Sequence, residues 1–193
     1  MSHIIALKKA AVAVGIERHL SGYRLKPPFG IDVSNPEMGD KTRTLLRRVS
    51  YSKEYVYVPT VAAAARFYLA HKSGTHYLQH RPMQLKPWPQ LLTFLDCSAF
   101  VTQCYYVAKR RDPNGLGYNG AGYTGTLIAN GMRVPTPAAG DLVFYGAPGG
   151  NGEHVAIYVG NGQVIGHGHE GGPDLTPVHY RGDFMCFRHY GTR

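Results

Sequence analysis

The sequence predicts an α+β domain in which helices precede an antiparallel sheet. An apolar, helix-like run, CSAFVTQCYYVAKRR, begins at Cys97 in the middle of the chain. Runs of β-type follow at 141–146, 154–168 and 184–191, and Asn161-Gly162 has the composition of a two-residue hairpin turn. Helices followed by strands are typical of α+β architecture, so we expect the helix that starts at Cys97 to pack on the sheet.

Length and composition limit the class of protein. The 193 residues are 44% hydrophobic and 17% charged, which fits one globular domain with a small additional module. No apolar run reaches 18 residues, so no membrane span is expected. The net charge of +9 favours an anionic partner such as nucleic acid, anionic lipid or an anionic cell wall. Because there is no block of Lys and Arg and no aromatic-basic motif, nucleic acid is the least favoured of these.

We expect a boundary near residue 58 that separates a helical N-terminal segment, 1–58, from a main domain, 59–193. Within the first segment, 4–16 has an amphipathic helical pattern and 39–49 resembles a second helix. Residues 51–58 fit either a short strand or a linker.

The main domain has clear helix signals. Thr60 is a suitable N-cap for an Ala-rich helix that ends at Gly74, and Asp96 is a suitable N-cap for the helix that starts at Cys97. Asp112-Pro113 should stop that second helix, because proline cannot continue it. We interpret residues 112–126 as a glycine-rich loop.

Cys97 could be a core residue, half of a disulfide, a metal ligand or a nucleophile. Cys104 lies two helical turns further along, about 10 Å away on the same face, which is too far for a disulfide. The three cysteines form no CxxC pair, which argues against a cysteine zinc site. A core cysteine and a nucleophile remain open on these grounds.

Two further motifs suggest cofactors only superficially. The stretch GLGYNG, 115–120, matches GxGxxG, but it follows no predicted strand and opens no predicted helix, so no dinucleotide site is expected. The stretch HGHE, 167–170, lacks the HExxH spacing and a matching carboxylate pair, so we expect no metal and no cofactor.

The predicted hairpin aligns several histidines. A two-residue turn pairs residue 160 with 163 and therefore 156 with 167 and 154 with 169. In this register His154, Ala156, His167 and His169 all lie on one face of the sheet. A change of one residue in the register would break this arrangement, because side chains alternate with period two.

These residue types suit acyl transfer by a cysteine. A helix N-terminus and a neighbouring histidine both favour the thiolate of Cys97. Unpaired N–H groups near Cys97 and Ser98 could stabilise an oxyanion, and a third polar group on the next strand would orient the base. The expected arrangement is therefore cysteine, histidine and a third polar residue.

The motifs together resemble those of the NlpC/P60 cysteine peptidases, which have a papain-like fold. DCSAFV is similar to the D-C-S-G-F-V nucleophile motif of that family, with Ala99 in place of glycine, and PTPAAGDLVFYG and HVAIYVGNGQVI are similar to its next two motifs. The resemblance covers about residues 60–190 and implies Cys97 as nucleophile, His154 as general base and His167 as the third residue. In the family the third residue usually follows the base by twelve positions, which here is Gly166. The pairing above favours His167, with His169 as the alternative.

The resemblance also implies substrate contacts. Tyr77 is similar to a tyrosine of lysins from viruses of actinobacteria, although it could equally be a packed aromatic residue. Asp96 and Ser98 flank the nucleophile and are the other expected substrate-binding residues. Residues 1–58 faintly resemble the last helix of peptidoglycan-binding bundles, and a helical extension of the catalytic domain fits them equally well.

The function that this resemblance implies is cleavage of stem-peptide amides in peptidoglycan by a cysteine endopeptidase, with the γ-D-glutamyl to diamino-acid bond as the expected site. The enzyme would be a phage lysin or a virion-associated lysin, monomeric unless it is part of a virion, with the anionic cell wall as its partner. The N-terminus lacks the order of a signal peptide, so we expect synthesis in the bacterial host cytoplasm and action on the wall after release. The alternatives are an inactive wall-binding module and an amidase or acyltransferase on the same fold.

Overall fold

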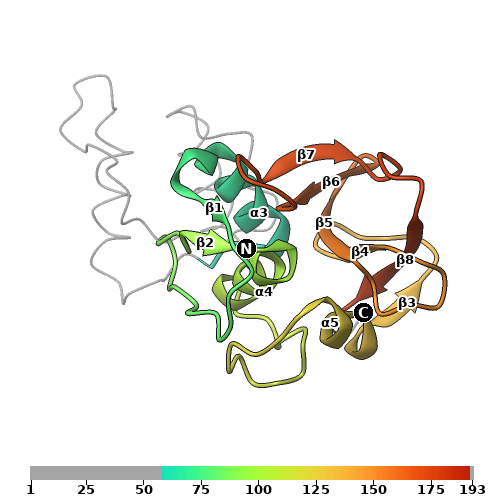
Figure 1. The fold of residues 1–193 in the computed structure, drawn as a ribbon, viewed down its shortest axis with the longest axis horizontal. Helices are drawn as coiled ribbons and strands as arrows, with labels where there is room; N and C mark the ends of the chain where they lie inside the picture. Colours follow the sequence, from blue (N-terminus) through green and yellow to red (C-terminus); the bar gives the residue numbers. More distant parts are fainter. Residues whose placement is uncertain (1–57, 192–193) are drawn as a thin grey trace, which may run out of the picture. The chain divides into compact units, whose positions relative to one another are not determined.

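The computed structural model describes residues 58–191, in which helices and an antiparallel sheet form one domain (Figure 1). Its helices are α3 (Val61–Ala70), α4 (Cys97–Val107) and α5 (Thr124–Asn130), and a 3₁₀ turn, Lys72–Gly74, follows α3. Its strands are β1 (His76–Tyr77), β2 (Phe94–Leu95), β3 (Met132–Val134), β4 (Leu142–Tyr145), β5 (His154–Gly160), β6 (Gln163–Gly166), β7 (Asp174–Pro177) and β8 (Phe184–His189). None of the helices in this range is long and apolar enough to cross a membrane.

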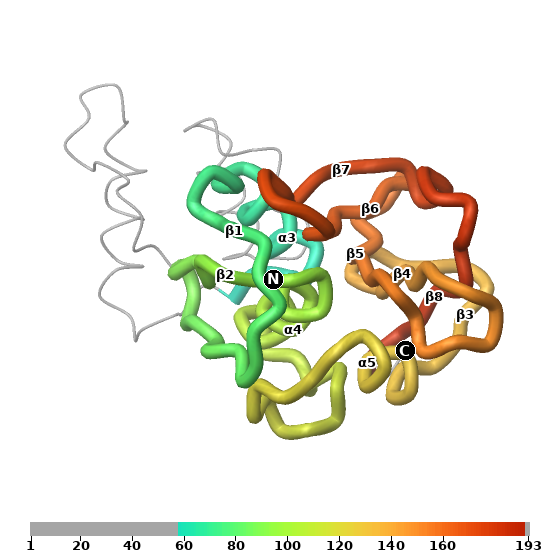
Figure 2. Tube along the Cα trace, in the orientation of Figure 1, coloured from blue at the N-terminus to red at the C-terminus, as the bar shows by residue number. Residues whose placement is uncertain are grey.

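The main sheet has six strands in the order β3-β8-β4-β5-β6-β7, and all neighbouring strands are antiparallel. The two-residue strands β1 and β2 form a separate parallel pair. Helix α4 packs on β5 and on α3, so the helix that begins at Cys97 covers the middle of the sheet (Figures 1 and 2). The predicted α+β fold is confirmed.

The two faces of the sheet carry separate apolar clusters. The helix-covered face contributes Leu142, Phe144, Val155, Ile157 and Ile165 to the larger cluster, together with the inner faces of α3 and α4. The opposite face holds a smaller cluster that includes Val143, Tyr145, Ala156 and Val164. This alternation along β4 and β5 is the period of two expected for strands. It fixes the face on which each side chain of the candidate site lies.

Helix α4 begins where the sequence predicts and ends earlier. The Asp96 carboxylate accepts a hydrogen bond from the Ala99 N–H at 2.8 Å, which confirms the predicted N-cap. Every residue of α4 except Tyr106 is buried, so tertiary packing rather than an amphipathic pattern stabilises it. The helix stops at Val107 because Lys109 adopts a left-handed conformation, with φ of 54°, before the chain reaches the predicted stop at Asp112-Pro113.

The β5–β6 hairpin has the predicted turn, but the predicted register beyond it is wrong. Gly160 pairs with Gln163, and Asn161 and Gly162 both have positive φ, as a two-residue hairpin turn requires. The register then shifts between Tyr158 and Gly160, so that Tyr158 pairs with residue 164 rather than 165. The irregularity places one additional residue on β5, and every later pairing therefore moves by one position.

Other elements were not predicted from the sequence. Helix α5 begins at Thr124, inside the stretch 112–126 whose glycine-rich composition predicts loop throughout. The short strands β1, β2, β3 and β7 had no clear alternating pattern. Thr60 caps α3 as predicted, since its hydroxyl accepts a hydrogen bond from the Ala63 N–H. The predictions for 4–16, 39–49 and 51–57 lie outside the described residues.

Candidate active site

Cys97 occupies the first turn of α4 and lies against the beginning of β5. Its side chain is buried, with Sγ 3.8 Å from the Thr124 hydroxyl at the start of α5. Burial and the neighbouring Asp96 charge raise the pKa of the thiol, whereas the N–H groups of Val155 and Ser98 and the Thr124 hydroxyl act in the opposite direction. The resting side chain is therefore a neutral thiol within reach of several hydrogen-bond donors.

His154 is the first residue of β5, next to the Val155 N–H that faces the thiol. Its imidazole is buried and contacts the Tyr145 ring, with 5.8 Å between ring centroids, on the face of the sheet away from α4. Burial, followed by the positive charge of Arg181, lowers the pKa of His154 to about 4. Within residues 58–191 neither ring nitrogen of His154 has a hydrogen-bond partner, Cys97 Sγ included.

Glycine occupies the backbone beneath the His154 ring. A Cβ placed on Gly166 would lie 3.0 Å from His154 Nε2, and one placed on Gly168 would lie 3.1 Å from Cε1. The observed register extends the pair Ile157–Ile165 by one step and places Gly166 opposite Ala156. The position from which a third residue would reach His154 is therefore residue 166, which has no side chain here.

His167 lies on the other face of the sheet, so the prediction that it shares a face with His154 is wrong. Its ring is fully buried beside Phe100 of α4 and stacks with Tyr77 at a centroid separation of 6.0 Å. Nε2 lies 3.3 Å from the Thr75 hydroxyl, and Nδ1 has no hydrogen-bond partner among the described residues. The shift in the hairpin register is the physical reason, because it exchanges the faces of residues 166 and 167.

His169, the alternative third residue, also lies away from the base. Its Nε2 forms an ion pair with Asp174 at 2.9 Å, and its Nδ1 contacts the Glu170 carbonyl oxygen at 2.7 Å. The side chain is exposed. Its electrostatic effect on the pKa of His154 is smaller than the effects of burial and of Arg181.

Asp96 and Ser98 are held by Arg81, which no sequence motif indicates. Arg81 Nη2 donates to Asp96 Oδ2 at 2.9 Å and to Ser98 Oγ at 2.6 Å, and the Ser98 hydroxyl donates to Asp96 Oδ1. The Gly122 carbonyl oxygen fixes the same guanidinium through Nε. Arg81 comes from a segment without helical or strand periodicity, so no sequence pattern indicated this contact.

Tyr77 is half-buried on β1, and its ring, backbone and hydroxyl all have contacts within the domain. Its ring stacks on His167, and its N–H donates to Glu170 Oε2 at 2.8 Å. The hydroxyl accepts a hydrogen bond from Gln79. The structure thus brings Cys97 and His154 to the beginning of β5 but places Tyr77 and His167 together on the helix-covered side.

The stretches resembling cofactor motifs have structural partners. In the loop that contains GLGYNG, the Asp112 carboxylate accepts hydrogen bonds from the N–H groups of Asn114, Leu116 and Tyr118, and so organises the turn. Among residues 58–191 no group of three or more His, Cys, Asp or Glu side chains is arranged to hold a metal ion. The three cysteines, all in this range, are free thiols.

Comparison with known proteins agrees with the resemblance read from the sequence. Residues 86–179 match the model of the NlpC/P60 family. The peptidoglycan endopeptidase RipB of Mycobacterium tuberculosis is 37% identical over 90 residues, which are 45% of this chain and 33% of RipB. The chain thus spans about a third of the length of this curated relative.

Two solved structures are similar to this chain. The NlpC/P60 domain of the peptidoglycan hydrolase SagA is 28% identical, with a TM-score of 0.48 over 67% of this chain and 96% of that one. A Staphylococcus aureus protein of the NLP/P60 family is 15% identical, with a TM-score of 0.50 over 99% of this chain and 62% of that one. The second of these likenesses, together with the six-stranded sheet and its covering helices, shows the NlpC/P60 fold.

Proposed function

We propose that this chain is a cysteine peptidase of the NlpC/P60 family that cleaves stem-peptide amide bonds in peptidoglycan, because residues 86–179 match the model of that family. The observation that carries the proposal is the position of Cys97 at the N-terminus of α4, with its thiol facing the backbone at the beginning of β5, where His154 lies. The related RipB is named a peptidoglycan endopeptidase, which supports the same substrate class.

The reaction follows from these two groups. His154 accepts the thiol proton as Cys97 Sγ attacks the carbonyl carbon, and the N–H groups at the start of α4 favour the negative charge that develops on the oxygen. The carbon–nitrogen bond then breaks, and the imidazolium returns its proton to the leaving amine. Water, deprotonated by His154, hydrolyses the thioester to a carboxylic acid and regenerates the thiol.

The resting site disfavours a thiolate–imidazolium pair. Burial raises the pKa of Cys97 and lowers that of His154 to about 4, so both groups are neutral at pH 7. In this proposal the proton therefore moves from sulfur to nitrogen during the attack on the substrate rather than before it. The Val155 and Ser98 N–H groups stabilise the sulfur as it gains charge.

The finer parts of the proposal concern the bond and the biological setting. We propose the γ-D-glutamyl to diamino-acid bond as the site of cleavage, and a phage or virion-associated lysin that reaches the wall after release from the host cytoplasm. The net charge of +9 supports association with an anionic wall. The Arg81–Asp96 ion pair bears on substrate choice, because an Asp96 carboxylate that is already paired is a weak receptor for a substrate amine.

Digestion of purified peptidoglycan tests the proposal. Wild-type protein should release soluble fragments with new amino and carboxyl termini, identified by mass spectrometry, and Cys97→Ala should release none. Cys104→Ala is the matched control, because Cys104 is a buried thiol on the same helix that lies outside the site. Equal digestion by wild type and Cys97→Ala would show that Cys97 is not the nucleophile.

Gly166 favours a second candidate function, a wall-binding domain that does not cleave. With glycine at residue 166, beneath the imidazole, no side chain within the described residues forms a hydrogen bond that would orient His154. Retention of intact peptidoglycan by wild-type protein, with no new termini, would support this candidate and exclude the peptidase.

A further inference from the structure

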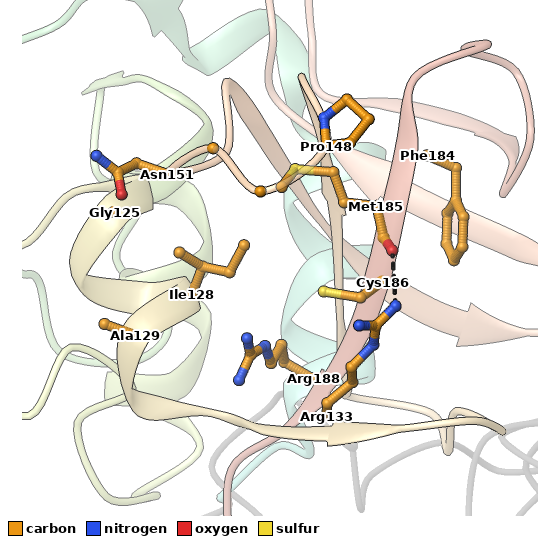
Figure 3. A pocket seen from close by; sticks show the side chains of 12 residues that line it. Gly125, Ile128, Ala129, Arg133, Pro148, Asn151, Phe184, Met185, Cys186 and Arg188 are labelled. Atoms are coloured by element: carbon orange, nitrogen blue, oxygen red, sulfur yellow. Dashed lines mark hydrogen bonds between the residues drawn. The ribbon is translucent and has the colours of Figure 1, made fainter.

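A cavity of about 500 Å³ lies beside the candidate active site, on the helix-covered face of the sheet. Its walls are α5, the loop 148–151 and the strands β3 and β8 (Figure 3). Ile128 and Ala129 of α5 line one side, and Arg133 and Arg188 come from the two strands on the other side (Figure 3). The cavity therefore combines an apolar wall with two guanidinium groups.

The two arginines are direct cross-strand partners. Arg133 of β3 pairs with Arg188 of β8 in the antiparallel register, so their side chains lie on the same face of the sheet. Like charges directly opposite each other on two strands are destabilising. The repulsion between the two guanidinium groups is reduced when an anion binds between them.

No carboxylate of the described chain neutralises this pair. None of the residues that line the cavity is acidic, and within residues 58–191 neither arginine forms an ion pair. Arg133 Nη2 reaches only the Met185 carbonyl oxygen, at 3.5 Å, and Arg188 donates through Nη1 to the Gly131 carbonyl oxygen. Arg188 Nε is buried and has no hydrogen-bond partner in the described range. Several guanidinium donors thus remain available to a ligand.

The cavity is connected to the candidate nucleophile through α5. Gly125 lines the cavity, and its neighbour Thr124 contacts Cys97 Sγ. A peptide that places an amide carbonyl at Cys97 has its neighbouring residues within reach of this helix. A γ-linked glutamyl residue keeps its α-carboxylate free, and the residues that follow it carry further carboxylates, so an anionic group is available near the scissile bond of such a substrate.

We propose that Arg133 and Arg188 form a carboxylate-binding subsite for the peptide substrate. The assignment rests on the proposed function for the identity of the peptide. Its physical basis is the pair of unneutralised guanidinium groups in a cavity next to α5. A guanidinium binds a carboxylate through two parallel N–H donors. Two neighbouring guanidinium groups therefore select a carboxylate over the neutral carboxamide of the same shape.

Binding to an inactive protein tests the subsite independently of cleavage. The Cys97→Ala protein is titrated by calorimetry with a stem tetrapeptide and with peptides in which each carboxylate in turn is replaced by a carboxamide. We expect one of these amidated peptides to bind about tenfold more weakly than the parent. When Arg133→Gln is added to the Cys97→Ala protein, the affinity for the parent peptide should fall by a similar factor. Amidation of the same carboxylate should then have little further effect on the affinity.

The matched control is Arg111→Gln, which removes the same charge from an exposed position away from the cavity. Arg133 is itself exposed, so its replacement should leave the fold intact. The variant Arg133→Glu gives a second measurement, because it converts the repulsive pair into an ion pair with Arg188: the Tm of the free protein should rise while carboxylate binding is lost. If every amidated peptide loses the same affinity in the Cys97→Ala protein with and without Arg133→Gln, the subsite does not exist. Failure to cleave peptidoglycan would overturn the proposed function but not this binding result.

Discussion

A side chain at residue 166 should supply the orienting contact that His154 lacks. Gly166 lies opposite Ala156 and beneath the imidazole, and its φ lies outside the left-handed region, so an L-residue is allowed there. We expect Gly166→His to increase kcat/KM on peptidoglycan fragments. The new imidazole can accept or donate a hydrogen bond to His154, hold its ring toward Cys97 and stabilise the imidazolium that forms during attack.

The magnitude follows from the geometry. A Cβ at residue 166 would lie 3.0 Å from His154 Nε2 and 3.1 Å from the Ala156 Cβ, so the His154 ring must move by a few tenths of an ångström. One hydrogen bond to a neutral side chain contributes about 0.5–1.5 kcal/mol, which corresponds to an increase of about 2- to 12-fold in kcat/KM. Gly166→Ala is the matched control, since it introduces the same Cβ without a hydrogen-bonding group.

The assay measures release of amino termini from a defined muropeptide by wild type, Gly166→His and Gly166→Ala. We expect kcat/KM of Gly166→His to exceed that of Gly166→Ala by about 2- to 12-fold. If the two variants have equal kcat/KM, orientation of His154 is not limiting. If wild type is inactive and Gly166→His acquires activity that Cys97→Ala removes, the natural chain is the wall-binding form of this fold.

Three other predictions concern the charged and titratable groups. Burial lowers the folded-state pKa of His154 and of His167 to about 4. The contribution of each histidine to the free energy of unfolding is therefore complete above pH 6.5, and up to about 3 kcal/mol of it is lost as the pH falls toward 4. Urea unfolding at pH 7 and pH 5 should show this loss of stability, and the loss should be smaller in His167→Gln. Because the pKa of Cys97 is raised, its alkylation by iodoacetamide should still be accelerating above pH 9, and a reaction that levels off near pH 6 would contradict the neutral pair. Arg81→Met should lower the free energy of unfolding by about 1–3 kcal/mol, because it leaves the buried Asp96 carboxylate without its charged partner. The effect of Arg81→Met should be smaller in a protein that already carries Asp96→Asn. Additive losses in the double variant would show that the two residues are not coupled.

The elements whose local signals agree with their packing were predictable. The N-cap Asp96 and the turn Asn161-Gly162 have side-chain and backbone preferences that act over three or four residues, and both were correctly identified. The end of α4 was not, because the left-handed conformation of Lys109 depends on how the following loop packs. Local chemistry therefore predicted where elements begin better than where they end.

The candidate site was predictable only where one strand or helix determines it. Cys97 and His154 each stand at the beginning of their own element, and the motifs around them locate both. The third residue depends on the register between two strands, and a single irregularity near Tyr158 reverses the faces of residues 166 and 167. No pattern in the printed sequence marks that irregularity, since the turn residues themselves are those of a regular hairpin.

If the proposed subsite is correct, the charges around Cys97 and in the neighbouring cavity favour a substrate that carries a free carboxylate. Asp96 is the acidic residue adjacent to the nucleophile, and its charge is offset by Arg81, while the cavity along α5 contains two arginines and no acid. A cationic group on the substrate thus finds no free carboxylate at either place, whereas a carboxylate finds unneutralised guanidinium groups at one of them. If instead Asp96 binds a substrate amine, Arg81 must release it, and Arg81→Met should then bind an amine-bearing peptide more tightly than wild type does. The sign of that change in affinity separates a site that selects peptides by their carboxylates from one that selects them by a free amine.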